Sequence, residues 1–182
     1  MPLIKDGHIV EDSWTVLEDG AEVPHQGDII ITLERFLSDI DQLARRLGRT
    51  GVALENTADP EDIAPHIGDL DLISLVFPAF TDGRAYSQAR HLRYHLGYTG
   101  ELRATGNVLA DQAGFLTQVG FDTFELTAGQ SIDVWNKASR AMTLAYQRGY
   151  DGDRKTRDKL QASPISINTP DCGAVSENPM PA

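Results

Sequence analysis

The densest run of side chains that could do chemistry lies at residues 78–88 and reads Pro-Ala-Phe-Thr-Asp-Gly-Arg-Ala-Tyr-Ser-Gln. It follows an apolar run at residues 70–77 that is typical of a strand buried on both faces. In open parallel sheets ligands bind beyond the carboxyl ends of the strands, and the free N–H groups of a helix N-terminus favour anions. This position makes Asp82, Arg84 and Tyr86 candidate ligand-binding residues.

The helix expected at residues 84–96 adds two more arginines. Arg90 and Arg93 share a stripe with Tyr86 when the segment is helical. The planar fork of an arginine aligns two N–H bonds with two oxygens, which suits the binding of an oxyanion. The stripe therefore extends the candidate site along the helix.

A strand expected at residues 101–105 adds a second polar group near the same edge of the sheet. Arg103 and Thr105 share a face of that strand, because side chains alternate with period two. A buried pair of Arg103 with Glu101 would equally serve a structural role. The candidate ligand-binding residues are Asp82, Arg84, Tyr86, Arg90, Arg93, Arg103 and Thr105.

The charge balance of the chain gives these arginines a second interpretation. The 182 residues carry 16 Lys and Arg against 27 Asp and Glu, a formal net charge of −11. In so acidic a chain, arginines are also expected to pair with carboxylates on the surface or at a subunit contact. The same acidity argues against nucleic acid and anionic membranes as partners.

Histidine and cysteine offer little further chemistry. His91 and His95 stand four residues apart, but no third ligand is recognisable and the glutamate of zinc hydrolases is missing between them, so no metal site is expected. Cys172 is the single cysteine and lies in a polar segment without a nearby histidine, which argues against a disulfide, a multi-cysteine cluster and a nucleophile. No motif announces a cofactor, because the phosphate-loop, dinucleotide and nucleophile-elbow patterns are all missing.

Composition indicates a soluble globular protein. Hydrophobic residues make up 41% and charged residues 24% of the chain. No apolar run approaches the roughly 20 residues that span a bilayer, and the N-terminus lacks the features of a signal peptide. We therefore expect a cytoplasmic protein with no membrane partner.

The pattern of elements predicts an α/β fold. Short strands or a hairpin are expected in residues 1–31, followed by a helix that begins at Thr32 and ends at Gly48. Later strands and helices alternate, and the list of expected elements is: strands at 51–54, 70–77, 101–105 and 123–126, and helices at 60–68, 84–96, 108–119 and 132–147.

This alternation implies right-handed crossovers and a small parallel sheet, either open and doubly wound or shaped like part of a barrel. Four candidate parallel strands are too few for a complete eight-stranded barrel. We expect a single domain over residues 1–150. Residues 151–182 form a polar, proline-containing tail that is expected to be flexible.

An extended motif carries a family resemblance. It runs Phe-Pro-Ala-Phe-Thr-Asp-Gly-Arg-Ala-Tyr-Ser-Gln-Ala-Arg-His-Leu-Arg over residues 77–93 and continues in Gly-Glu-Leu-Arg-Ala-Thr-Gly at 100–106, Asp-Gln at 111–112 and Gly-Phe-Asp at 120–122. Over about residues 30–146 the chain resembles an uncharacterised bacterial family that is often encoded beside sulfite reductase. Members are commonly labelled oxidoreductases probably involved in sulfite reduction.

The resemblance implies an accessory factor of assimilatory sulfite reduction, with sulfite reductase or another sulfur-assimilation protein as its partner. It brings no established catalytic residues to carry over. A single cysteine also cannot supply the four thiolates of an iron–sulfur cluster, so the six-electron reduction itself is expected elsewhere. Two alternatives stay open: an enzyme that binds a small oxyanion through the arginines, and a structural homo-oligomer whose motif residues form the subunit contact.

Overall fold

A parallel sheet of sequential strands forms the centre of the protein. The computed structural model describes residues 1–127 and 129–141. Its sheet has the order β2-β1-β8-β7-β6-β5-β4-β3. The strands are β1 (Leu3–Lys5), β2 (His8–Val10), β3 (Trp14–Val16), β4 (Asp28–Thr32), β5 (Thr50–Leu54), β6 (Leu72–Phe77), β7 (Glu101–Gly106) and β8 (Thr123–Glu125). Strands β3 to β8 run parallel in chain order, and β1 and β2 are antiparallel additions beyond β8.

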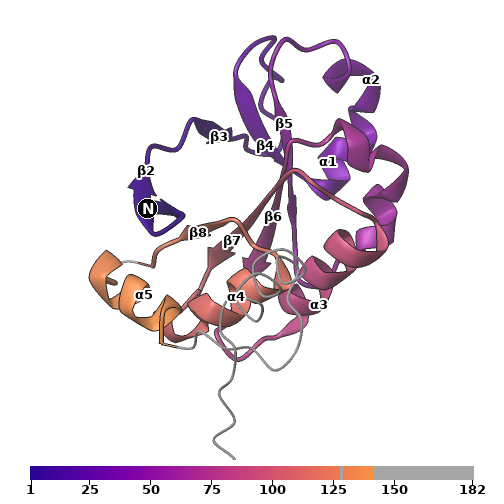
Figure 1. Ribbon diagram of the computed structural model, residues 1–182. Helices are drawn as coiled ribbons and strands as arrows, with labels where there is room; N and C mark the ends of the chain where they lie inside the picture. The colour runs from indigo at the N-terminus through magenta and orange to yellow at the C-terminus, as the bar shows by residue number, and fades with distance from the viewer. Residues whose placement is uncertain (128, 142–182) are drawn as a thin grey trace, which may run out of the picture.

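The sheet curls into part of a barrel (Figure 1). Its two edge strands, β2 and β3, follow each other in the chain with only residues 11–13 between them. A flat sheet of this width would separate its edges by about 34 Å at about 4.8 Å per strand, whereas the connection reaches only about 14 Å. The partial-barrel form of the predicted fold is therefore the one confirmed, because a doubly wound sheet would need a reversal in strand order.

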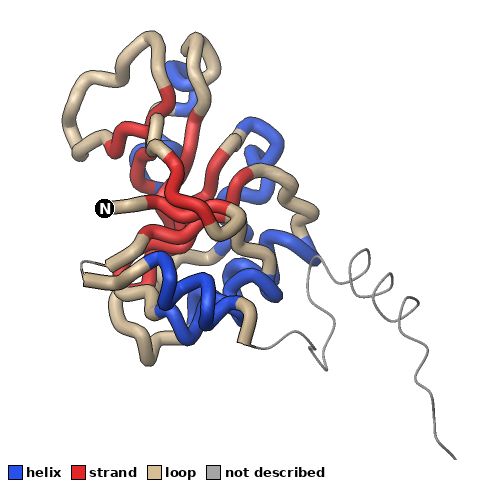
Figure 2. The backbone as a smooth tube through the Cα atoms, turned by 60° about the vertical axis from the view of Figure 1, so that its left-hand side comes forward, coloured by secondary structure: helices blue, strands red, loops and turns tan. Residues whose placement is uncertain are grey.

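Helices cover the convex side of the sheet (Figure 2). They are the α-helices α1 (Leu33–Ser38), α2 (Ile40–Leu43), α3 (Arg84–Arg90), α4 (Ala113–Val119) and α5 (Ile132–Ser139), the 3-10 segments η1 (Pro60–Asp69) and η3 (Ala110–Gln112), and the π-helical turn η2 (His91–His95). Among the described helices none is long and apolar enough to cross a membrane.

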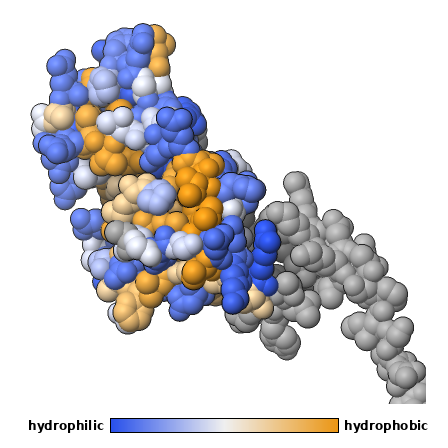
Figure 3. Space-filling view, turned by 90° about the vertical axis from the view of Figure 1, so that its left-hand side faces the viewer, coloured by the Kyte–Doolittle hydropathy of each residue, from blue (hydrophilic) through white to orange (hydrophobic). Residues whose placement is uncertain are grey.

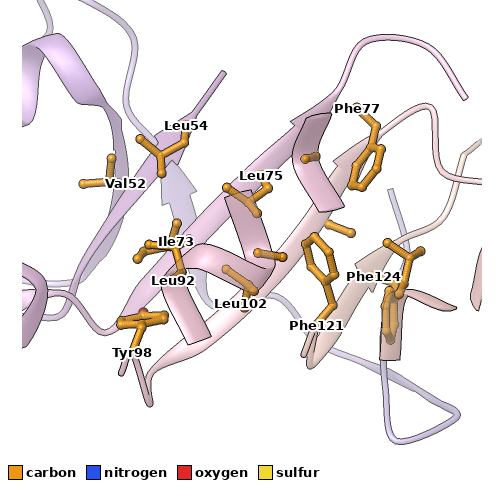
Figure 4. Close-up of a cluster of buried hydrophobic side chains, with 14 of the residues drawn as sticks. Val52, Leu54, Ile73, Leu75, Phe77, Leu92, Tyr98, Leu102, Phe121 and Phe124 are labelled. Carbon is orange, nitrogen blue, oxygen red and sulfur yellow. The ribbon is translucent and has the colours of Figure 1, made fainter. Parts of the chain in front are cut away.

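The main core lies between the sheet and these helices (Figure 4). Ala85, Ala89 and Leu92 of α3 and η2 are fully buried, as their helical spacing predicts, and Ile73 and Leu75 of β6 meet them from the sheet. The other, concave face of the sheet is more polar. It carries buried side chains of Ser74, Arg103 and Thr123.

The predicted N-terminal hairpin is confirmed, and it adds β1 and β2 to the sheet beside β8. Asp6 and Gly7 have φ angles of 50° and 78°, which is the conformation that a two-residue hairpin turn requires. Asn136 of α5 donates its side-chain N–H to the carbonyl oxygen of Gly7 at 2.9 Å. On this face hydrophobic residues gather in patches that hydrophilic residues surround (Figure 3), and Ile9 and Val16 are exposed.

The helix predicted from Thr32 to Gly48 is shorter than expected. It breaks at Asp39 and ends at Leu43, and Leu47 is 69% exposed instead of buried. The reason is a competing contact, since the backbone N–H of Leu47 donates to the carbonyl oxygen of His25 at 2.9 Å. Gly48 has no left-handed conformation. It is a close-approach position, where a Cβ would collide with the carbonyl of Gly27.

Two later helices also differ from their predicted bounds. The helix predicted at residues 84–96 changes from α to π geometry at His91. Of the helix predicted at residues 132–147, α5 covers Ile132–Ser139, residues 140 and 141 form a turn, and residues 142–147 lie outside the described residues. Cys172, the predicted tail at 151–182 and the predicted domain end at residue 150 lie outside the described residues.

Candidate functional site

Asp82 is the centre of a hydrogen-bonded group in the loop after β6. Arg84 donates to both carboxylate oxygens of Asp82, from Nε at 3.0 Å and from Nη2 at 2.7 Å. The side-chain amide of Asn56, from the loop after β5, donates to Asp82 Oδ2 at 2.6 Å. The Arg84 guanidinium, followed by the Arg84 backbone N–H, lowers the pKa of Asp82 to about 2. Asp82 is thus a fixed carboxylate that neutralises Arg84.

Hydrogen bonds tie neighbouring loops together along the carboxyl edge of the sheet. Besides the Asn56–Asp82 bond, the hydroxyl of Thr32 at the end of β4 donates to Asp19 Oδ1 at 3.1 Å. The side-chain amide of Gln112 in η3 donates to the carbonyl oxygen of Phe80 at 3.0 Å. These bonds join the loop after β3 to the end of β4, and the segments after β5 and β7 to the loop after β6, which carries Phe80, a residue that is 52% exposed.

The charge at this edge is mostly negative. Residues 17–20, 33–36, 55–59, 78–84 and 107–111, which follow the carboxyl ends of β3 to β7, contain seven acidic residues and two arginines. We call the acidic residues the acidic rim: Glu18, Asp19, Glu34, Glu55, Asp59, Asp82 and Asp111. Of the two arginines, Arg84 pairs with Asp82, and Arg35 donates to Asp39 and to the carbonyls of Glu18 and Ala21.

Arg103 lies on the concave face of the sheet, away from the rim. Its side chain is only 4% exposed and pairs with Asp12 at 2.8 Å and Glu101 at 3.0 Å. Thr123 donates its hydroxyl to the same Glu101 oxygen at 2.8 Å. Asp12 comes from the connection between β2 and β3, so this network joins the two edges of the curled sheet to its middle.

Thr105 shares the face of Arg103, as period-two alternation predicts. Its hydroxyl lies 3.1 Å from the hydroxyl of Ser74 on the neighbouring strand β6. Thr105 stands nearer the carboxyl end of β7 than Arg103 does. The two residues therefore follow the concave face toward the edge that holds Asp82 and Arg84.

The other three candidates lie elsewhere. Tyr86 is half-buried against Phe77 and Phe115, with ring centroids 5.2 and 4.8 Å away, and burial raises its pKa. Arg90 is exposed on the outer side of α3, with its guanidinium 5.4 Å from the centre of the Tyr94 ring. Neither residue faces the rim.

Arg93 lies at the opposite, amino end of the strands. Its buried guanidinium donates to the carbonyl oxygens of Tyr98, Gly100 and Gly120 and pairs with Asp122 at 2.6 Å. These acceptors directly precede β7 and β8, so Arg93 holds the two strand entries together.

Sequence reasoning missed several residues of this site. Asn56 follows β5 as Asp82 follows β6, so the rule of carboxyl ends applied to every strand would have found it. Asp12 lies 91 residues from Arg103 in a short exposed connection, and no local pattern marks it as a partner.

The described part of the chain contains no group of three or more His, Cys, Asp and Glu residues arranged to hold a metal ion. The rings of His91 and His95 stack with centroids 4.9 Å apart, and His91 Nε2 lies 2.6 Å from Glu61 Oε1. His91 therefore links η2 to η1.

Fold and site together define a partial βα-barrel protein whose carboxyl edge is acidic, braced by hydrogen bonds and marked by an exposed phenylalanine. A family model described as a bacterial protein of unknown function, DUF934, matches residues 51–156, and the chain belongs to this family. No curated protein matches the chain.

Proposed function

We propose that the chain is a cytoplasmic accessory protein of assimilatory sulfite reduction. In this role it binds sulfite reductase or another sulfur-assimilation protein through the acidic rim. The pathway comes from the resemblance carried by the motifs of residues 77–122. The mode of action comes from one observation, which is that the exposed Phe80 lies in a loop that hydrogen bonds fix to its two neighbours, at an edge whose loops carry seven acidic residues.

Such a surface has the properties of a docking site for a basic partner. An aromatic side chain enclosed by polar groups is the usual anchor of an interface. Complementary charge increases the rate of encounter and excludes wrong partners. Because the loops are already braced, little conformational freedom is lost when the partner binds.

The same contacts weigh against the enzyme that binds a small oxyanion. On the rim, Arg84 is held by Asp82, and on the concave face Arg103 is held by Asp12 and Glu101. An oxyanion would have to displace these carboxylates from their arginines and would meet the remaining acidic rim. A cationic or basic partner meets no such opposition.

The pathway is tested by deleting the gene and scoring growth on sulfate, sulfite and cysteine as sole sulfur sources. We expect failure on sulfate and sulfite and rescue by cysteine. Normal growth on all three sources would overturn the pathway assignment.

The docking mode is tested in the same deletion strain by returning variants of the full chain. Phe80→Ser and Asp111→Lys should lower both growth on sulfate and the recovery of a sulfur-assimilation enzyme with the tagged protein. Asp41→Lys changes an exposed acid of α2, away from the rim, and is the matched control. Equal recovery with all three variants would show that the rim is not the docking surface. A change in the sedimentation coefficient of the protein itself in Phe80→Ser or Asp111→Lys would indicate that the rim is a contact between its own subunits instead.

A further inference from the structure

A groove of about 820 Å³ lies between residues 22–25, which precede β4, and helix α2 with the turn that follows it. This volume falls within the roughly 300–1,000 Å³ of small-molecule sites. The two walls are joined where the backbone N–H of Leu47 donates to the carbonyl oxygen of His25 at 2.9 Å, next to a bridge between Gln26 and Leu47. The fold itself therefore sets the distance between the two walls.

Arg46 forms a fixed positive wall of this groove. Its Nε donates to the carbonyl oxygen of Pro24 at 2.8 Å, its Nη2 to that of Gly27 at 2.6 Å, and its Nη1 to the carbonyl oxygen of Arg49 and the hydroxyl of Thr50 at 3.3 and 3.1 Å. All four acceptors are uncharged, and burial lowers the pKa of Arg46. Because a guanidinium has five N–H donors, one on Nη2 has no acceptor among the described residues.

Two further charged side chains line the groove without pairing. Arg45 and Glu22 are exposed, and neither side chain makes an ion pair or a hydrogen bond within the part of the chain that the structure describes. Where opposite charges serve only to hold the fold they pair, as Arg49 does with Asp28 at 2.5 Å. Charges of both signs therefore face one groove and do not neutralise each other.

The groove lies apart from the acidic rim. Gly27 and Thr50, which Arg46 contacts, stand at the amino ends of β4 and β5, whereas the rim follows the carboxyl ends of the strands. Val23, which is 8% exposed, and Pro24 add apolar surface to the lining. The groove thus combines positive, negative and apolar surfaces.

We propose that this groove binds a zwitterion with an apolar body, which is the chemistry of a free amino acid or a short peptide. The carboxylate of the ligand binds Arg45 and the free N–H of Arg46, and its ammonium group faces Glu22. The apolar body lies against Val23 and Pro24. A simple oxyanion would leave Glu22 unmatched, and a simple amine would leave both arginines unmatched.

Titration of the ¹⁵N-labelled full chain with leucine and with the tripeptide Ala-Leu-Ala tests the proposal. We expect the backbone N–H signals of Val23 and Arg45 to shift, and the tighter of the two probes tells an amino-acid site from a peptide site. Acetylating the amino group of the probe, or amidating its carboxylate, removes one charge and should raise Kd about tenfold, as expected for the loss of one charge-assisted hydrogen bond.

Two variants assign the ends of the ligand. Arg45→Gln should raise Kd about tenfold and abolish the further loss caused by amidation, and Glu22→Gln should do the same for acetylation, because each variant removes the partner of one charge. Arg90→Gln and Glu11→Gln change exposed residues outside the groove and are the matched controls, with Kd unchanged.

No shift of these signals at about 10 mM of either probe would overturn the proposal. Acetylated probes that bind as tightly as the free ones would overturn it in favour of an anion site. Equal Kd in wild type, Arg45→Gln and Glu22→Gln would show that the probes bind elsewhere. All the substituted side chains are exposed, so the ¹⁵N spectra of the variants should otherwise match that of the wild type.

Discussion

The guanidinium of Arg103 fits two roles by its place in the sequence, a ligand for an anion or the partner of a carboxylate. Its position on a strand near a carboxyl edge is typical of an anion ligand. In the structure it satisfies Asp12 and Glu101 and so joins the N-terminal connection to β7. Both roles use the same property of arginine, whose rigid guanidinium can donate two N–H bonds to a pair of oxygen atoms.

Replacing Arg103 by Met should destabilise the protein strongly. The change leaves Glu101, with 18% of its side chain exposed, without its main partner, and it frees Asp12. Breaking a buried ion pair typically costs about 3–5 kcal/mol, and we expect about 2–3 kcal/mol here because Asp12 is 38% exposed. Urea denaturation measures this loss. Arg45→Met, at an exposed arginine in the turn after α2, should leave the urea midpoint nearly unchanged, and equal losses in both variants would contradict the assignment.

Asp82 should make stability depend on acid pH. Its pKa is lowered to about 2 in the folded chain from an ordinary value of 3.8. The resulting stabilisation is fully present above pH 4 and is lost as the pH falls toward 2. In urea titrations between pH 6 and 2, the stability difference between wild type and Asp82→Asn should therefore shrink below pH 4. A difference that stays constant over this range would show that the carboxylate has an ordinary pKa.

One glycine inside helix α4 and one just after its end should respond to substitution by alanine with changes in stability of opposite sign. Gly120 ends the helix with a φ of 109°, a left-handed conformation that suits glycine. Gly114 lies inside the helix, where an added Cβ meets nothing within 4 Å. Gly120→Ala should cost about 1 kcal/mol, while Gly114→Ala should stabilise by about 0.5–1 kcal/mol. Thermal unfolding of the two variants checks the signs, and a loss in both would contradict this account of the helix.

Elements with strong local signals were predictable from the sequence. The run that forms β6 is apolar except for Ser74, and Asp59 accepts from the backbone N–H of Glu61 just before η1, as its position before Pro60 predicts. The first helix was overestimated because its apolar stripe continues to Leu47. There, pairing with the loop at His25 outcompetes the helix, and no local pattern records a partner 22 residues away.

The residues of the candidate site also divide into those that local sequence patterns predict and those that they do not. Asp82, Arg84 and the shared face of Arg103 and Thr105 follow from strand ends and period-two alternation. Helical stripes, in contrast, do not say which end of a helix faces the rim. Arg93 lies about two turns beyond Arg84 and so reaches the amino ends of the strands instead.

At the scale of the whole molecule, the acidic rim predicts a salt-dependent interaction. If the partner is attracted by the rim, its recovery with the tagged protein should fall as salt is raised, because screening shortens the reach of exposed charges to about 8 Å at physiological ionic strength. Phe80→Ser should weaken recovery at every salt concentration, whereas Asp111→Lys should reduce the salt dependence itself. Recovery that is independent of salt would indicate an apolar docking surface elsewhere.

The pairing of β1 with β8 sets the order in which the chain can fold. Leu3 lies opposite Glu125, so β1 can form its hairpin with β2 at once but must wait for β8, the last described strand, before it joins the parallel strands. Such non-local pairing slows folding, since the chain must close a long loop before the contact stabilises it. Until then the edge of β1 that faces β8 remains uncovered, and an uncovered strand edge is where a nascent chain is most open to aggregation and chaperone binding.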